Sequence, residues 1–269
     1  MGFHCFSKKI IYILIAIILL LFIIVISFLN ILHHQSQNKL LHESSHGYIN
    51  DENILYDFTN EKLKKDFIYE TLAKYKDKKV IALTFDDGPS RYTPMLLNIL
   101  KKHNVCSTFF LLSSKVDKNV DTIKQMSDDG HLIASHGYSH KIFTRLEDNE
   151  IVEEIKLSKD KIEKITNKPL KFIRVPFGII NDDVLSILNS FNLTSVLWHI
   201  DSTDWKLKNT QKITNKVVKK ARNRRIILMH DTYKSSVLAV DKIIEKLKSD
   251  YSFVTVEELM ILNTYSKLR

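Results

Sequence analysis

Cysteine is scarce in this chain, with only two among 269 residues, too few for a disulfide framework. Cys5 precedes a long apolar segment, and Cys106 lies far beyond it. If that segment crosses a membrane, the two thiols lie on opposite sides and an intrachain disulfide is excluded. The main body of the protein must then be stabilised by its own hydrophobic core.

Charge is absent from a stretch near the amino terminus. Between Ile10 and Leu29 every residue except Ser27 is apolar or aromatic. A helix of that length, at ~1.5 Å per residue, spans the ~30 Å hydrocarbon core of a bilayer. The segment also lacks the small-residue pair of a signal-peptide cleavage site. We therefore predict a transmembrane helix at residues 10–30 that remains attached as an anchor.

The basic residues around this apolar run predict its orientation. Lys8 and Lys9 precede it, and only Lys39 follows soon after it. Because positive charge favours the cytoplasmic side, residues 1–9 are predicted to be a cytoplasmic tail. Residues 31–77 then form an extracytoplasmic spacer with a short helix, and residues 78–269 a single folded domain. This organisation predicts a single-pass protein of the cell membrane.

The formal net charge of +9 does not by itself exclude any class of binding partner. The distribution of the charged residues along the chain is more informative. Lysines alternate with acids or apolar residues along the predicted helices, as on ordinary solvated faces, which argues against nucleic-acid binding. A basic surface instead suits an anionic neighbour such as a cell wall or lipid headgroups. Nothing in the sequence determines an oligomeric state.

One motif in the spacer resembles a zinc-protease site. Residues 42–46 read His-Glu-Ser-Ser-His, which binds zinc only when a helix brings both histidines to one face. The two serines and the following Gly47 disfavour a helix, and the segment has no apolar face to bury. We therefore set the protease interpretation aside.

Short β-branched runs alternate with amphipathic helical patterns in the rest of the chain, beginning with a buried strand over Val80–Leu83 and a helix over Tyr92–His103. Further strands are predicted at 108–112, 132–135, 172–175, 194–198, 226–229 and 253–256. Further helices are predicted at 60–74, 120–127, 148–165, 182–189, 212–221 and 237–248. This alternation is typical of an α/β domain with parallel strands, and about seven units can close into a barrel.

Polar motifs follow five of the predicted strands, where ligands gather in such folds. They are residues 84–90 (Thr-Phe-Asp-Asp-Gly-Pro-Ser), 136–140 (His-Gly-Tyr-Ser-His), 174–178 (Arg-Val-Pro-Phe-Gly), 201–205 (Asp-Ser-Thr-Asp-Trp) and 228–231 (Leu-Met-His-Asp). His136, His140 and Asp87 would provide three metal ligands with one open position, the composition of a catalytic zinc site. Each motif alone could equally be an ordinary turn or loop.

Taken together and in this order, the five motifs resemble those of the polysaccharide deacetylase family, the NodB-like carbohydrate esterases. The resemblance extends from about Lys78 to the end of the chain. It implies a distorted (β/α)7 barrel and the removal of N-acetyl groups from a glycan. It also implies a divalent metal held by Asp87, His136 and His140, which is zinc by preference, with cobalt and nickel as alternatives.

The same resemblance assigns proton-transfer roles to four residues. Asp86 corresponds to the general base that takes a proton from the attacking water, and Arg174 to its partner. His230 corresponds to the general acid that protonates the leaving nitrogen, with Asp204 orienting it. Together with the metal, these residues would supply a nucleophile and a proton donor.

Three more residues are implied in binding the acetyl group. The backbone N–H of Phe177 would stabilise the oxyanion, while Trp205 and Leu228 would form the wall of a small pocket for the methyl group. Simple core filling is the alternative for the last two. The chain departs from the family pattern at Gly137, where Ser or Thr often braces the loop, and at Phe177, where Tyr is common.

The sequence therefore predicts a membrane-anchored, extracytoplasmic, metal-dependent deacetylase of a cell-wall glycan, with peptidoglycan N-acetylglucosamine as the preferred substrate. Chitin oligomers, poly-N-acetylglucosamine, N-acetylmuramic acid and O-acetyl groups are alternative substrates. A non-catalytic glycan-binding homologue is the alternative of another class, although no ligand, base or acid of the motifs is missing. Free amines on the wall would also be expected to impair lysozyme binding.

Overall fold

The computed structural model describes Ser27 and residues 61–265. The predicted cytoplasmic tail, membrane anchor and most of the spacer lie outside these residues. Within the described part, no helix is both long and apolar enough to cross a membrane. The helix predicted at the end of the spacer is present as α2 (Glu61–Lys74), and it packs against the last helix, α10 (Val256–Tyr265).

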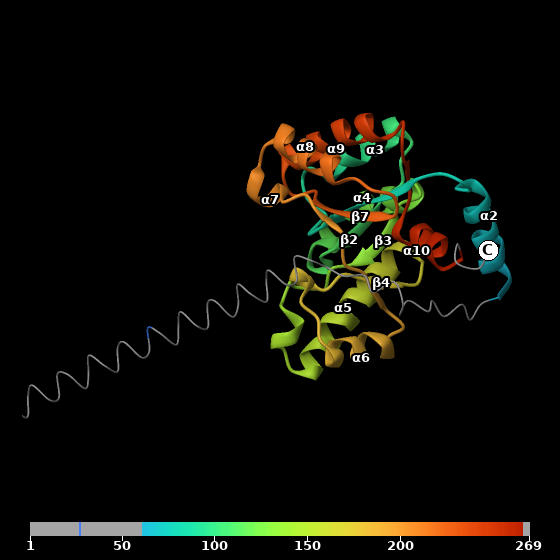
Figure 1. The fold of residues 1–269 in the computed structure, drawn as a ribbon. Coiled ribbons are helices and arrows are strands. Elements are labelled where there is room, and N and C mark those ends of the chain that lie inside the picture. Colours follow the sequence, from blue (N-terminus) through green and yellow to red (C-terminus); the bar gives the residue numbers. More distant parts are fainter. Residues whose placement is uncertain (1–26, 28–60, 266–269) are drawn as a thin grey trace, which may run out of the picture. The chain divides into compact units, whose positions relative to one another are not determined.

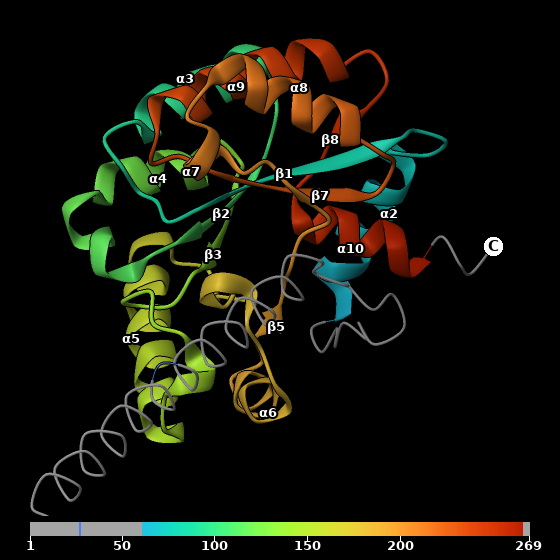
Figure 2. The ribbon, with the colours of Figure 1, turned by 60° about the vertical axis from the view of Figure 1, so that its left-hand side comes forward.

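A sheet of parallel strands forms the centre of the domain, as predicted (Figure 2). The first strand, β1 (Val80–Asp86), pairs with β2 on one side and β7 on the other. The strand order is β5-β4-β3-β2-β1-β7-β6, and β8 pairs with the start of β1. The remaining strands are β2 (Thr108–Leu111), β3 (Leu132–Ser135), β4 (Phe172–Ile173), β5 (Thr194–Ser195), β6 (Ile200–Asp201), β7 (Arg225–His230) and β8 (Ser252–Phe253).

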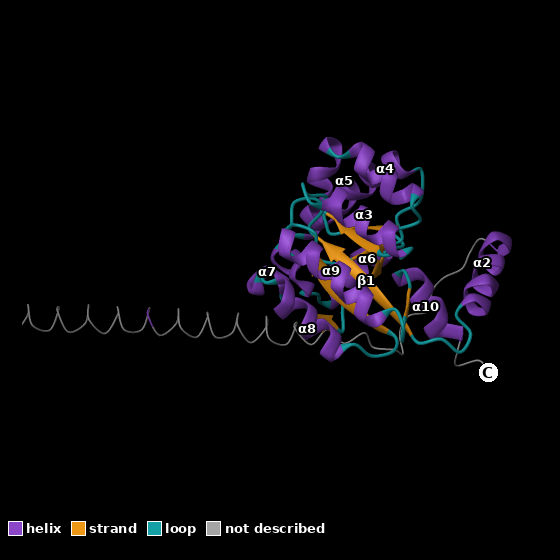
Figure 3. Ribbon diagram, turned by 90° about the horizontal axis from the view of Figure 1, so that it is seen from above, coloured by secondary structure: helices purple, strands orange, loops and turns teal. Residues whose placement is uncertain are grey.

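The predicted barrel is incompletely closed. Among the described residues, β5 and β6 end the ladder without pairing with each other, so the sheet is a curled half-barrel. Helices cover its outer face (Figures 1 and 3). These are α3 (Thr93–His103), α4 (Val120–Asp128), α5 (Asp148–Thr166), α6 (Asp182–Ser190), α8 (Thr210–Lys220) and α9 (Lys234–Leu247).

Several boundaries differ from the predicted ones for physical reasons. The first strand runs through Asp86 instead of ending before the acids, because its backbone pairs with β2 and β7 as far as that residue. A buried arginine compensates the Asp86 carboxylate. The strands β4, β5 and β8 are only two residues long, and α10 already begins at Val256. Two elements were not predicted because they are too short to produce a periodic pattern, namely β6 and α7 (Asp204–Leu207).

The alternation of side chains along β1 determines what reaches the interior of the half-barrel. Ile81, Leu83 and Phe85 belong to the core between sheet and helices. Val80 and Ala82 belong to a second core on the opposite face, which includes Phe110, Phe172 and Trp198. Because side chains along a strand alternate between faces, Asp86 shares the second, inner face. A carboxylate is therefore directed into the half-barrel at the end of its central strand.

Candidate active site

Two neighbouring acids at the end of β1 separate because of the backbone conformation. Asp86 is paired in register with His230 at the end of β7, and its side chain is buried. Asp87 follows with a φ of 70°, in the left-handed region that few residues other than glycine adopt. The chain turns sharply at this point, so the two carboxylates can serve different partners.

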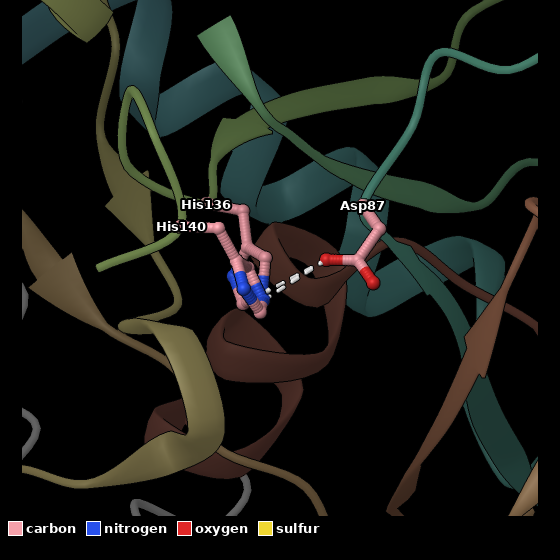
Figure 4. A group of neighbouring side chains, drawn as sticks. All are labelled: Asp87, His136 and His140. Atoms are coloured by element: carbon pink, nitrogen blue, oxygen red, sulfur yellow. Dashed lines mark ion pairs between the residues drawn. The ribbon is translucent and has the colours of Figure 1, made fainter. Parts of the chain in front are cut away.

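The structure brings the three predicted metal ligands together (Figure 4). Asp87 Oδ1 lies 3.2 Å from His140 Nε2 and 3.5 Å from His136 Nε2. One ligand atom from each residue lies within 4.8 Å of the others. Both histidines belong to the loop that leaves the end of β3, and His140 also has a left-handed φ of 65°.

The donor atoms fit a divalent metal. His136 Nδ1 lies 2.7 Å from the carbonyl oxygen of Arg174, which can only accept a hydrogen bond. The proton must therefore be on Nδ1, leaving the lone pair of Nε2 directed to Asp87. Asp87 Oδ1 is buried and has no hydrogen-bond partner within the part of the chain that the structure describes. Ligands ~2.1 Å from a tetrahedral zinc lie about 3.4 Å apart, close to the two separations in this site.

The protonation states of Asp87 and His136 also suit metal binding. Burial would raise the pKa of this carboxyl group, but the imidazoles of His140, His136 and His230 lower it well below its ordinary value. Burial lowers the pKa of the fully buried His136, which keeps the ring neutral. An ionised carboxylate and a neutral imidazole are the forms that bind metals.

A second group with potential ligand atoms lies elsewhere, where α3 and α9 meet. It consists of His103, Asp241 and Glu245. Lys102 Nζ already lies 3.0 Å from Asp241 Oδ1 and 3.9 Å from Glu245 Oε1. Since a lysine neutralises these acids, the group resembles a surface ion-pair network more than a metal site.

Arg174 holds Asp86 from the inner face of the half-barrel. Its Nη1 lies 2.7 Å from Asp86 Oδ1, and its side chain is completely buried. The guanidinium carbon lies 4.0 Å from the centre of the Phe110 ring. Its other hydrogen bonds are to Thr84 Oγ1 at 2.8 Å, Val196 O at 3.0 Å and Leu197 O at 3.1 Å. These contacts fix Asp86 Oδ1, while Oδ2 lies 3.9 Å from His136 Nε2.

His230 faces the same space from β7. Its Nδ1 lies 2.8 Å from Asp204 Oδ1, and its backbone N–H donates to Asp204 Oδ2 at 2.7 Å. Burial lowers the pKa of His230, but the hydrogen bond and charge of Asp204 outweigh it and raise the value to about 9. The imidazole is therefore protonated at neutral pH. Its Nε2 lies 4.0 Å from Asp87 Oδ2, across the candidate metal site.

The three residues predicted to bind the acetyl group occupy different environments. Phe177 has a left-handed φ of 64°, and its exposed ring lies 4.7 Å from that of His140, measured between centroids. Trp205 is 50% exposed, which excludes core filling for that residue. Leu228 is 5% exposed and belongs to the inner hydrophobic core. Their predicted roles remain predictions.

Sequence reasoning missed the residues that support the Asp87 loop. Lys115 Nζ donates to the carbonyl oxygen of Asp87 at 2.7 Å. Asp231 packs so closely on Gly88 that an added Cβ would lie 2.6 Å from its Oδ2, and it accepts a hydrogen bond from the Thr93 hydroxyl. Asp231 is the last residue of one of the five motifs, although no role was predicted for it, and no local pattern distinguishes Lys115 from the other lysines.

The chain resembles several known deacetylases. A family model for polysaccharide deacetylases matches residues 73–196. Peptidoglycan-N-acetylmuramic acid deacetylase PdaC of Bacillus subtilis is 40% identical over 185 residues, which cover 68% of this chain and 39% of PdaC. A solved structure of PdaC superposes with a TM-score of 0.67 and 38% identity, covering 72% of this chain and 96% of that one.

Two other relatives are named as N-acetylglucosamine deacetylases. PgdA of Listeria monocytogenes is 38% identical over 190 residues, covering 70% of this chain and 40% of PgdA. A Bacillus cereus peptidoglycan-N-acetylglucosamine deacetylase is 37% identical over 199 residues, covering 71% of this chain and 93% of the relative. The chain thus spans about two fifths of PdaC and PgdA but nearly all of the third relative. On this similarity, and on the five motifs gathered at one edge of its sheet, the chain belongs to the polysaccharide deacetylase family.

Proposed function

We propose that this protein is a metal-dependent hydrolase that removes acetyl groups from the N-acetylated sugars of peptidoglycan. The observation that carries the proposal is the convergence of three separate groups on one space. Asp87, His136 and His140 offer metal ligands, Asp86 is held by a buried arginine, and a protonated His230 faces both. Family membership supports the reaction class.

A divalent metal, zinc by preference, would be held by Asp87, His136 and His140. When bound, it would polarise the acetyl carbonyl and make a water molecule more acidic. The open coordination position follows from having only three protein ligands. Zinc is preferred because two imidazoles and one carboxylate suit it, although cobalt and nickel accept the same donors.

Asp86 is suited to accept the proton of the attacking water. Arg174 occupies its Oδ1 at 2.7 Å, while Oδ2 lies beside His136 at 3.9 Å from Nε2. The fixed carboxylate can therefore act as a base without competing for the metal. The backbone N–H of Phe177 is proposed to stabilise the negative charge on the acetyl oxygen.

His230 is suited to complete the reaction as the acid. Asp204 holds its Nδ1, so the proton on Nε2 is directed toward the site. When the carbon–nitrogen bond of the amide breaks, this proton passes to the nitrogen and gives the free amine. The acetyl group leaves as acetate with the oxygen of the attacking water. The Trp205 ring and Leu228 are proposed to enclose the methyl group.

For the substrate we propose peptidoglycan N-acetylglucosamine, in agreement with the names of two of the three relatives reported above. The name of PdaC favours N-acetylmuramic acid as a second candidate. The exposed rings of Phe177 and Trp205 are suited to stack on sugar rings beside the site. Acetate release from walls, followed by identification of the deacetylated sugar, would distinguish the two candidates.

We also propose that the apolar segment at residues 10–30 anchors the protein, with the deacetylase domain facing the wall. The support is the uncharged run and the lysines that precede it. Protease treatment of intact protoplasts should then degrade the domain.

Walls from cells lacking the gene should keep more acetyl groups and become more sensitive to lysozyme. Unchanged acetylation would contradict the proposed deacetylase function.

Removing the metal should abolish the reaction. Treating the purified protein with a strong chelator is expected to reduce acetate release from peptidoglycan or N-acetylglucosamine oligomers to background, because carbonyl polarisation and water activation are both lost. Adding zinc, cobalt or nickel should restore it. Undiminished release from protein shown to be metal-free would overturn the proposed mechanism.

Replacing Asp204 with Asn should lower kcat by about 10² to 10⁴-fold, the range of general acid–base catalysis. Asn can keep a hydrogen bond to the ring but removes the charge that favours the protonated form of His230. Because the metal ligands are untouched, zinc affinity should remain near that of the wild type. A variant with normal kcat would show that Asp204 does not support the acid.

A further inference from the structure

The loop between the two metal-binding histidines is attached to a buried acid on α5. Glu154 is only 5% exposed, although glutamate on a helix is seldom so deeply buried unless it is paired. Its Oε2 accepts hydrogen bonds from the backbone N–H groups of Tyr138 and Ser139, each at 2.8 Å. Its Oε1 accepts from the Ser139 hydroxyl. All three donors lie between His136 and His140.

The conformation of this loop explains why it needs such a support. His140 has a φ of 65°, and a residue other than glycine keeps such a left-handed conformation only where the surroundings determine it. Gly137 has a φ of 77°, which glycine adopts without strain. Glu154 also packs on the loop, since a Cβ added to Gly137 would lie 3.5 Å from its Oε2. That separation is an ordinary van der Waals contact, so the carboxylate lies directly against the loop.

The same helix supports the loop at a second point, one turn further along. The Ser158 hydroxyl lies 2.6 Å from Ser135 Oγ, which in turn accepts from the Gly137 N–H at 3.0 Å. Ser113 also contacts Ser158. These serines are fully buried. The start and the middle of the loop are therefore both tied to α5.

We propose that Glu154 is a positioning residue for the metal centre. Its hydrogen bonds are to Tyr138 and Ser139, not to the imidazole rings of the metal ligands. They hold the backbone that directs both rings to Asp87. Charge-assisted hydrogen bonds that two successive N–H groups donate to a buried carboxylate are suited to this task. The inference rests on the proposed function, because it concerns the affinity of the proposed site for its ion.

The test is the zinc affinity of the purified full-length protein, measured in competition with a chromophoric chelator. Glu154→Gln has the same shape, but its amide nitrogen cannot accept, so at least one loop donor loses its acceptor. Affinity is expected to fall about 10 to 100-fold, as for groups that orient metal ligands indirectly. The matched control is Glu153→Gln, an exposed neighbour on α5, which should bind zinc like the wild type.

Hydrogen exchange provides a readout that does not depend on the metal. In metal-free protein, the amides of Tyr138 and Ser139 should exchange faster in Glu154→Gln than in the wild type or in Glu153→Gln. Zinc affinity within about twofold of the wild type would overturn the inference. If Glu154→Gln does not fold, Ser139→Ala, which removes only the hydroxyl contact, should still weaken zinc binding, and unchanged binding would overturn it.

The outcomes for this inference and for the proposed function are distinguishable. If the wild-type protein binds no zinc, cobalt or nickel, the proposed metal-dependent function fails, and the inference fails with it. If the wild type binds zinc and Glu154→Gln binds it equally well, only the positioning role is lost.

Discussion

Asp86→Asn should reduce acetate release from N-acetylglucosamine oligomers by about 10² to 10⁴-fold while leaving zinc affinity close to that of the wild type. The variant keeps an oxygen for Arg174 but loses the carboxylate that accepts a proton from water. In the wild type, Asp86 Oδ2 lies 3.9 Å from His136 Nε2. Asp87 Oδ1 lies closer to the imidazoles, at 3.2 Å from His140 Nε2 and 3.5 Å from His136 Nε2. We therefore expect substitutions of the two adjacent acids to reduce activity for different reasons.

The matched variant is Asp87→Asn, which should lose zinc affinity and activity together. Zinc titration and acetate release, measured on both proteins, separate a base from a ligand. If Asp86→Asn lost zinc as severely as Asp87→Asn, the proposed division of roles would be wrong. Thermal unfolding should be recorded alongside, because Asp86→Asn leaves the buried Arg174 without its counter-ion.

Arg174→Met should lower the free energy of unfolding by about 3 to 5 kcal/mol, the usual cost of removing one partner from a buried ion pair. The guanidinium is completely buried and bonds to Asp86, Thr84 and two backbone carbonyl groups. Methionine fills much of the space but leaves the carboxylate and both carbonyls without donors. Activity should fall at temperatures where the variant is still folded, because Asp86 loses its support.

The appropriate control is Arg225→Met, since Arg225 is exposed at the start of β7 and its loss should change stability by less than about 0.5 kcal/mol. Adding Asp86→Asn to Arg174→Met should recover part of the lost stability, because the uncompensated buried charge disappears. Chemical denaturation of the wild type, the two single variants Asp86→Asn and Arg174→Met, and the double variant measures this coupling. Simple additivity of the two changes would contradict a direct ion pair.

The parallel α/β architecture was predictable because each strand and helix is encoded by its local pattern. Short β-branched runs predicted most of the strands, and helical periodicity predicted the long helices. Closure of the barrel was not predictable in the same way. The ladder is open between β5 and β6 in the described residues, and these strands are only two residues long. Such short pairings depend on tertiary packing and leave no periodic signal.

The candidate site likewise has some properties that the sequence predicts and others that depend on tertiary packing. The sequence by itself predicted which residues could bind a metal, because that ability belongs to side-chain chemistry and the motifs fall at strand ends. The proton-transfer roles were predicted from the resemblance of these motifs to those of the polysaccharide deacetylase family. Only the tertiary structure decided that Trp205 is exposed and Leu228 buried, that Arg174 O fixes the tautomer of His136, and that Glu154 braces the histidine loop. These properties arise from contacts between segments far apart in the chain, and no local pattern encodes such contacts.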